Sequence, residues 1–156
     1  MTRSTPTVST GSIADAVAFV DTNVLVYAHD ASETVKQPIA EAVLQELWSS
    51  GTGVLSTQIL QEFYSVATCK LKPPMSTAQE REIVSLYSAW PVVLIEPSLI
   101  LTASRLQEQH QLSFWDALVV EAARAFGASR LISEDFNDGQ DIEGIRIENP
   151  FRDRVP

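Results

Sequence analysis

The feature that most constrains the fold is the stretch Ala-Phe-Val-Asp-Thr-Asn-Val-Leu, which runs from Ala18 to Leu25. It opens with a short apolar run containing an aromatic and a β-branched side chain, and such a run predicts a buried strand. Asp21 follows at once, and Thr22 and Asn23 are small polar residues of the kind that begin helices. In open α/β sheets, ligands bind at the carboxyl ends of the strands. Asp21 is therefore either a helix cap or part of a binding site, and this stretch alone favours neither.

The length of the chain fits one folded domain. Its 156 residues, 45% of them hydrophobic, can bury a sizeable core and exclude general disorder. We expect a flexible lead-in over 1–16, which is rich in Ser, Thr and Gly, a folded domain over 17–151 and a loose charged tail over 152–156. The sequence contains no apolar run of roughly 20 residues and no signal-peptide pattern, so we expect a cytoplasmic protein without membrane contact.

The charge balance and the single cysteine argue against several functions. A formal net charge of −9 argues against a broad basic surface, which supplies most of the affinity in nucleic-acid binding. Cys69 has no second cysteine with which to form an internal disulfide. It lies in an apolar helical pattern with no histidine nearby, so we expect a small buried side chain rather than a reactive thiol.

Strand-like and helix-like segments alternate along the chain. The expected strands lie at 18–20, 54–55, 91–95, 128–133 and, as an edge-like strand, 144–148. The expected helices lie at 24–28, 36–49, 58–69, 76–89 and 98–109, with a last one from about 112. Alternation of this kind implies an α/β fold with a parallel sheet and right-handed crossovers.

Two helix starts have the spacing of a capping box. In the helix at 76–89, Ser76 precedes Gln79 by three residues, and we expect Leu86 of this helix to face the core. In the last helix, Ser113 precedes Asp116 by the same interval. This last helix is the most hydrophobic in the chain, so we expect it to be central. Asp116 could cap the helix and still present an oxygen to a cleft.

Glu62 and Asp135 also occupy positions at which solvent exposure alone does not explain an acidic side chain. Glu62 lies three residues after Ile59 and four before Val66, so helical spacing places it on or beside the buried face of its helix. Asp135 comes just after the strand expected at 128–133. Its neighbours Glu134 and Asp138 are interpreted as ordinary members of a flexible acidic turn.

The four acids Asp21, Glu62, Asp116 and Asp135 together indicate a metal site. No Lys, Arg or His occupies a comparable position, and gathered carboxylates repel one another unless a cation lies between them. An all-oxygen site suits Mg²⁺ or Mn²⁺, whereas the two histidines lack the spacing of zinc ligands. No glycine-rich phosphate loop is present. Carboxylate-bound Mg²⁺ most often supports hydrolysis of phosphate esters.

Four blocks of the sequence resemble the signature motifs of PIN-domain ribonucleases, especially VapC-type toxins. The blocks are Val-Asp-Thr-Asn-Val-Leu-Val-Tyr at 20–27, Ser-Thr-Gln-Ile-Leu-Gln-Glu-Phe-Tyr at 56–64, Leu-Ser-Phe-Trp-Asp-Ala-Leu at 112–118 and Leu-Ile-Ser-Glu-Asp-Phe at 131–136. The resemblance implies a three-layer α/β/α sandwich with a central parallel sheet and RNA cleavage that depends on Mg²⁺ or Mn²⁺.

The same resemblance assigns roles to individual residues. Asp21, Glu62 and Asp116 match the three main metal-binding acids of the family, and Asp135 matches the more variable fourth. In supporting positions, Asn23 matches the small polar residue after the first acid, and Ser133 stands where the family often has Thr. Metal binding and catalysis are therefore both expected from these acids. The net negative charge of the chain is a departure from the family pattern. It bears on the affinity for RNA more than on the metal-binding acids.

The resemblance also implies protein partners. VapC toxins of type II toxin–antitoxin pairs bind a cognate antitoxin, which lays a helical segment in a groove and can extend a basic side chain toward the acidic site. We expect such a surface near Tyr64, Leu71 and Met75, because Met and aromatic side chains suit helix-in-groove binding. A homodimer is also expected, since these toxins usually pair through an isologous surface.

Other functions remain open at this point. An Asp after a first strand is also found in haloacid-dehalogenase-like phosphatases, but they need a second Asp where this chain has Asn23. Response-regulator receivers carry adjacent acids there and a late-strand Lys that this chain lacks. Two alternatives stand beside a ribonuclease: another Mg²⁺-dependent phosphoester hydrolase, and a non-catalytic PIN-like module that only binds a partner protein.

Overall fold

The computed structural model describes residues 16–152, which form six helices and a six-stranded sheet. The strands are β1 (Ala18–Val20), β2 (Gly53–Ser56), β3 (Val92–Val93), β4 (Arg130–Ile132), β5 (Asp141–Ile142) and β6 (Ile145–Glu148). The helices are α1 (Thr22–Ala28), α2 (Lys36–Ser50), α3 (Thr57–Cys69), α4 (Thr77–Tyr87), α5 (Pro97–His110) and α6 (Phe114–Phe126). Apart from Ala16 and Arg152, the lead-in expected at 1–16 and the tail expected at 152–156 lie outside the described residues.

The sheet has the strand order β3-β2-β1-β4-β6-β5. Every neighbouring pair is parallel except β5 and β6, which are antiparallel. The α/β class predicted from the alternation of elements is therefore confirmed. The prediction that 144–148 forms an edge strand is wrong, because β6 lies between β4 and β5 and buries Ile145 and Ile147. The two-residue strand β5 covers it, and a strand that short leaves almost no periodic signal in a sequence.

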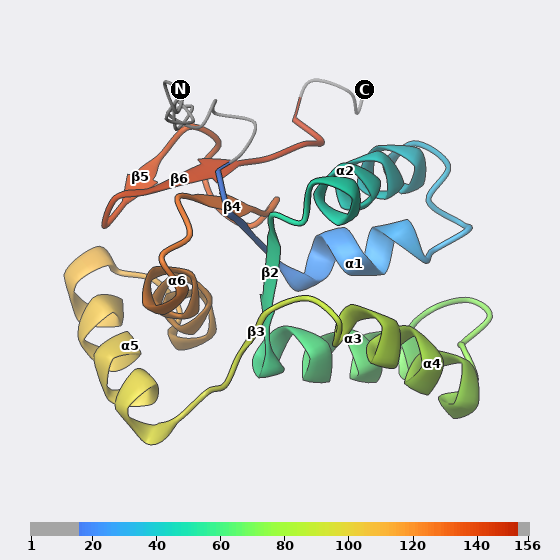
Figure 1. Cartoon of the computed structure of the whole chain (residues 1–156), viewed down its shortest axis with the longest axis horizontal. Coiled ribbons are helices and arrows are strands. Elements are labelled where there is room, and N and C mark those ends of the chain that lie inside the picture. The colour runs from blue at the N-terminus through green and yellow to red at the C-terminus, as the bar shows by residue number, and fades with distance from the viewer. Residues whose placement is uncertain (1–15, 153–156) are drawn as a thin grey trace, which may run out of the picture.

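Helices cover both faces of the sheet. Figure 1 shows α5 and α6 on one side of it and α1 and α2 on the other, with α3 and α4 beside α1. Helix α6 contacts β2, β3, β4 and β6, so the helix predicted to be central does span the sheet. This arrangement is the three-layer sandwich that the resemblance implied. Among residues 16–152, no helix is long and apolar enough to cross a membrane.

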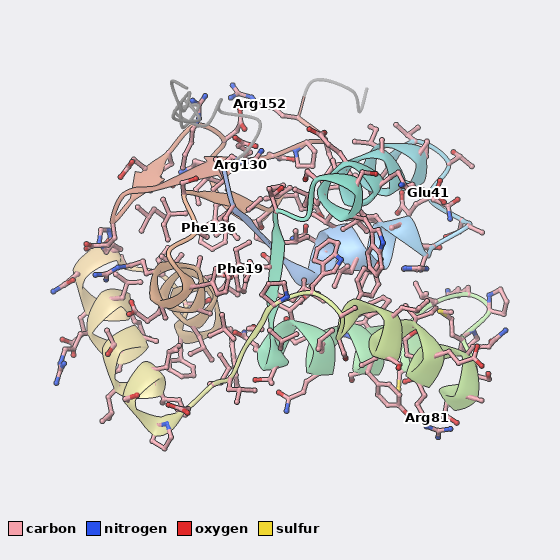
Figure 2. All side chains as sticks on the ribbon, viewed as in Figure 1. Phe19, Glu41, Arg81, Arg130, Phe136 and Arg152 are labelled. Carbon is pink, nitrogen blue, oxygen red and sulfur yellow. The ribbon has the colours of Figure 1, made fainter. Side chains whose placement is uncertain are left out.

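The core lies between the layers and is formed by side chains of the strands and of the helix faces that pack on them. Phe19 of β1 is fully buried in the interior, whereas Arg81 of α4 points away from it (Figure 2). Gly53 begins β2 directly against Trp90, since a Cβ atom at this position would lie 2.4 Å from the indole ring. A glycine at this strand start is therefore required for Trp90 to pack beneath the sheet.

Several side chains face a different way from the sequence prediction. Cys69 is exposed because it is the last residue of α3, where the buried face of the helix has ended. Leu86 is exposed and Leu71 is buried. The buried face of α4 instead holds Tyr87 and, seven residues earlier, Glu80. Sequence reasoning missed Glu80, since an acid in a polar first turn has the pattern of a solvated helix start.

Candidate active site

The candidate site forms where β1 and β4 end side by side. The two strands are parallel, with Val20 paired to Ile132, so the residues that follow them, Asp21 and Ser133, meet at one edge of the sheet. The Ser133 hydroxyl donates a hydrogen bond to Asp21 Oδ2 at 2.7 Å across 112 residues of sequence. The strand ends thus bring together an acid and a hydroxyl that were both predicted as site residues.

Asp21 turns out to be a helix cap and a member of the cluster at once. Its Oδ1 accepts the backbone N–H of Thr22 at 2.8 Å at the start of α1, and its side chain is only 4% exposed. Burial raises the pKa of Asp21 to about 7. Hydrogen bonds from Ser133 and Thr22 lower this pKa in part, while the charges of Asp135 and Glu62 raise it further. The two readings left open by the sequence are therefore compatible.

Ser133 and Asn23 connect the first acid to the fourth. Ser133 Oγ accepts the backbone N–H of Asp135 at 3.1 Å, and Asn23 Nδ2 donates to Ser133 Oγ at 3.3 Å. The same Asn23 nitrogen donates to Asp135 Oδ2 at 3.1 Å and lies 3.5 Å from Asp21 Oδ2. These contacts hold the carboxylates of Asp21 and Asp135 in one network of neutral donors.

Glu62 is held by two polar residues that the sequence analysis did not single out. Thr22 Oγ1 donates to Glu62 Oε2 at 2.6 Å, and Gln58 Nε2 donates to Glu62 Oε1 at 3.0 Å. A signal existed for each: Thr22 follows the first acid directly, and Gln58 precedes Glu62 by one helical turn. Glu62 is half-buried on α3, as its position beside the apolar face predicted.

Asp116 enters the cluster from the first turn of α6. Its backbone N–H donates to Ser113 Oγ at 3.1 Å, so Ser113 caps the helix as predicted. Ser76 and Gln79 form both bonds of a capping box, whereas Ser113 and Asp116 form the serine half, which leaves the Asp116 carboxylate for the cluster. Burial raises the pKa of Asp116, a hydrogen bond with Ser113 lowers it in part, and the charges of Asp135 and Glu62 raise it.

The four acids influence one another without a cation between them. Asp135 and Glu62 raise the pKa of both Asp21 and Asp116, so all four carboxyls lie within Coulombic range of the same small region. The ion pairs formed by residues 16–152 involve other acids, namely Glu121, Glu134, Asp138, Glu143 and Glu148. Among the described residues, like charge accumulates here with neutral donors beside it.

The chemistry of this donor set fits a hard divalent cation. The available ligands are carboxylate oxygens, which Mg²⁺ and Mn²⁺ prefer, and their positive partner is missing from the part of the chain described. Within residues 16–152, however, no three Asp, Glu, His or Cys side chains are already drawn together as a complete ligand set. The site is therefore defined by shared charge and hydrogen bonds, not by a preformed coordination shell.

Glu134 and Asp138 lie in the bend and turn after β4, as the prediction of an acidic turn implied, and both are held there by partners that the prediction did not include. Glu134 pairs with Lys36 of α2 at 3.0 Å and accepts a hydrogen bond from the Tyr27 hydroxyl. Asp138 pairs with Arg152 at 3.1 Å and accepts the backbone N–H of Asn149 at 2.8 Å. Both acids bind the segment after β4 to neighbouring elements, which no local sequence pattern could show.

A larger hollow lies away from the acids, among α1, α2 and α4. It has a volume of about 740 Å³, and its walls include Ala28, His29, Trp48, Leu86 and Tyr87. Trp48 and Leu86 are both exposed there. This is not the surface near Tyr64, Leu71 and Met75 that the sequence suggested, and Leu71 in that surface is buried.

Comparison with known proteins identifies the class of this fold. The model of the PIN domain family matches residues 18–137, which include all four acids. The chain therefore belongs to the PIN domain family, whose members are typically nucleases and commonly depend on Mg²⁺. No curated protein sequence matches the chain at a significant level.

Several solved structures with a similar fold are toxins or toxin–antitoxin complexes. A toxin–antitoxin complex from Klebsiella pneumoniae is similar with a TM-score of 0.63 and 21% identity over 85% of this chain and 97% of that one. VapC20 of Mycobacterium tuberculosis, a toxin that cleaves the sarcin–ricin loop, is similar with a TM-score of 0.57 and 18% identity over 73% of this chain and 86% of that one. VapBC2 of Rickettsia felis, bound to a promoter DNA fragment, is similar with a TM-score of 0.58 and 19% identity over 85% of this chain and 98% of that one. At these identities the likeness shows the fold alone.

Proposed function

We propose that this protein is a metal-dependent endoribonuclease that acts as the toxin of a type II toxin–antitoxin pair. The observation that carries the proposal is the group of four acids gathered beside the ends of β1 and β4, where among residues 16–152 neutral donors hold Asp21 and no Lys, Arg or His pairs with these acids. Membership of the PIN family and the likeness to VapC toxins support the same reading. RNA is the proposed substrate because the toxin similar to this chain cleaves an RNA loop.

Asp21, Glu62, Asp116 and Asp135 are the residues that would hold Mg²⁺ or Mn²⁺. A cation bound there supplies an activated water and stabilises the leaving oxygen of a phosphate ester. The protein's own contribution is to fix the carboxylates: Ser133 holds Asp21, and Thr22 holds Glu62. Because the pKa of Asp21 is about 7, this carboxyl gains its charge as the pH rises through neutrality. We expect metal affinity and cleavage to rise over the same interval.

The decisive experiment is a digest of total RNA with Mg²⁺, with Mn²⁺ and with a chelator, followed by mapping of the product ends. Attack of water on phosphorus with O3′ as the leaving oxygen, and no part played by the RNA 2′-hydroxyl, leaves a 5′-phosphate and a 3′-hydroxyl, and we expect these ends in the metal-containing reactions only. Products with 2′,3′-cyclic phosphate ends would exclude this mechanism. The same digest of DNA shows whether the activity is confined to RNA.

The rival reading is a PIN-like module that binds a partner without catalysis. Its support is that the acids of residues 16–152 do not already form a complete metal-ligand set. Isothermal titration with Mn²⁺ separates the two readings before any substrate is added. A catalytic protein should bind Mn²⁺ and lose binding when Asp116 is replaced by Asn, whereas a non-catalytic module should bind no divalent cation.

We propose the hollow among α1, α2 and α4 as the docking surface for the antitoxin. Several similar structures are complexes of a toxin with its antitoxin. The exposed Trp48 and Leu86 are apolar anchors of the kind that receive an amphipathic helix, and Glu41 in the same wall favours a basic partner. Co-expression with the neighbouring small reading frame should yield a complex, and Leu86→Asp should weaken it. A partner that binds Leu86→Asp as well as the original chain would place the interface elsewhere.

A homodimer is the second expected assembly. Isologous pairing could place two acidic sites along one RNA groove that neither subunit has alone. Light scattering of the purified chain should give about twice the mass of one chain. A monomeric mass, together with failure to slow growth on expression, would contradict the toxin assignment but not the nuclease one.

A further inference from the structure

A second hollow lies directly beside the acids and is distinct from the proposed antitoxin groove. It has a volume of about 390 Å³ and is lined by residues of α3 and the first turn of α6, namely Gln58, Gln61, Glu62, Ser65 and Trp115. One wall is therefore Glu62, a proposed metal ligand, and another is the residue that precedes Asp116. Whatever occupies this hollow lies next to the reacting phosphate of a bound RNA.

Trp115 is unusually placed for so large an apolar side chain. It is 61% exposed although it belongs to the most hydrophobic helix of the chain. The Trp115 ring packs against the ring of Phe114 in an edge-on arrangement, with the ring centroids 5.2 Å apart. Trp115 lines the hollow, and an exposed indole ring can bind planar groups by stacking.

Gln58 joins this indole to the metal site. Its Nε2 donates to Glu62 Oε1 at 3.0 Å and to the backbone oxygen of Trp115 at 3.3 Å, so one amide fixes both walls of the hollow. Gln58 is buried, with only 4% of its surface exposed. Its Oε1 has no hydrogen-bond partner among the described residues, which leaves one buried acceptor unused in the wall.

We propose that this hollow is a nucleotide subsite in which an unpaired base of the RNA stacks on Trp115. This inference rests on the proposed ribonuclease function and identifies how its substrate is held. The polar side chains of Gln61 and Ser65 face the edge of the base, and Gln58 acts as a positioning residue that aligns the indole with Glu62. A base is uncharged, so it can lie beside a carboxylate where a phosphate would be repelled.

The proposal also accounts for RNA binding by an acidic protein. With 20 acidic and 11 basic residues, the chain carries an excess of negative charge, which opposes binding of the RNA backbone. Base stacking on an aromatic side chain gives affinity that does not depend on net charge. It requires an unstacked base, so the substrate should be a single strand or a loop rather than a duplex.

Binding is measured separately from cleavage, in an Asp21→Asn background with Mg²⁺ present and a labelled, unstructured oligoribonucleotide as the probe. Trp115→Ala should weaken binding about five-fold to about a hundred-fold, the range of one stacked base. Trp115→Phe, which keeps an aromatic face, should recover most of it. Phe126→Ala is the matched control, because Phe126 is also an exposed aromatic of α6 but lies at its other end.

Steady-state cleavage by the otherwise unaltered protein gives the second readout. Trp115→Ala should raise KM more than it lowers kcat and should change the preferred base beside the cleaved bond. Gln58→Leu should also raise KM and change the preferred base, since it removes the hydrogen bonds from Gln58 to Glu62 and to the backbone of Trp115. A stable fold of each variant is verified by its melting temperature.

Three results would overturn the subsite. The first is Trp115→Ala with unchanged oligonucleotide binding, KM and cleavage preference in an enzyme that still cuts RNA, which refutes the subsite and spares the ribonuclease. The second is conversion of a dimer to a monomer by Trp115→Ala, which assigns the indole to a contact between subunits. The third is failure of the unaltered chain to bind or cut RNA, which refutes the proposed function itself.

Discussion

Two buried carboxyls, Asp21 at the strand ends and Glu80 on α4, have the same raised pKa but different surroundings. The pKa of each is about 7, and burial is the main cause in both. Asp21 accepts hydrogen bonds from Ser133 and Thr22 and has other acids beside it. Glu80 is fully buried, and both of its carboxyl oxygens lack a hydrogen-bond partner in the described part of the chain. A raised pKa therefore reports burial, whereas neutral donors and neighbouring charges distinguish a candidate site.

The largest expected effect is the loss of cleavage when a member of the cluster becomes neutral. Asp21→Asn and Asp116→Asn should each reduce RNA cleavage more than about a hundred-fold, because residues that merely orient metal ligands already contribute about 10- to 100-fold. Without metal, both variants should melt at the same or a higher temperature, since one of four repelling charges is gone. Glu82→Gln, on the exposed face of α4, is the control and should change neither quantity. Unfolding of both variants would instead assign these acids a structural role.

Removal of the Ser133 hydroxyl should have the next largest effect. Ser133→Ala leaves Asp21 Oδ2 without its 2.7 Å donor and Asp135 N–H without its acceptor, so cleavage should fall about 10- to 100-fold. The pKa of Asp21 should rise further, which moves the pH dependence of cleavage to higher pH. Ser133→Thr keeps the hydroxyl and should keep most of the activity. Equal activity of the Ala and Thr variants would show that the hydroxyl does not position the acids.

Glu80 should affect stability and leave activity unchanged. Its carboxyl is neutral in the folded state up to a pKa of about 7, against 4.5 when solvated. The folded state therefore loses stability as the pH rises from about 4.5 to about 7 and stays at the lower level above it. Glu80→Gln removes this dependence and should stabilise the protein by about 1–3 kcal/mol at pH 8. Urea unfolding at several pH values measures the free energy of unfolding of both proteins. A loss of cleavage in Glu80→Gln would show that Glu80, like Asp21, belongs to the site.

The smallest effect should come from the ion pair at the rim of the site. Lys36 bonds Glu134 at 3.0 Å and the Tyr27 hydroxyl at 3.2 Å, with both charged side chains partly exposed. Lys36→Met should lower the free energy of unfolding by about 0.2–1 kcal/mol, as for other exposed pairs. Cleavage should change less than in Ser133→Ala. If Lys36→Met abolished cleavage as Asp21→Asn should, the boundary of the site would have to include Lys36.

The sequence predicts elements and strand-end residues well because their signals are local. The run before Asp21 and the apolar stripe around Glu62 each need only a few neighbouring residues to interpret, and the structure brings both acids to one place. Their role in catalysis stays a prediction. The contacts between Thr22 and Glu62 or between Gln58 and Trp115 join residues 40 and 57 positions apart. Such contacts depend on how helices pack on the sheet, and no periodic pattern encodes them.

The burial of Glu80 shows the opposite limit. Helix propensity and capping place it correctly in the first turn of α4, with Ser76 as the cap. Its burial is a result of tertiary packing, and α4 packs against α3, whereas local pattern assigns this side chain to solvent. The sequence predicts the conformation of this turn but not which of its side chains is enclosed.

The two-residue lengths of β3 and β5, the outermost strands of the sheet, have a consequence for association. A strand edge templates the addition of another chain only if it offers a row of unpaired N–H and C=O groups, and edges this short offer very few. Fibril growth by edge-to-edge pairing is therefore disfavoured even when the chain is produced alone. Within residues 16–152, association of two copies is therefore expected through helices and side chains, and mutations on the surface of α5, where Leu101 is exposed, can alter assembly without disturbing the sheet.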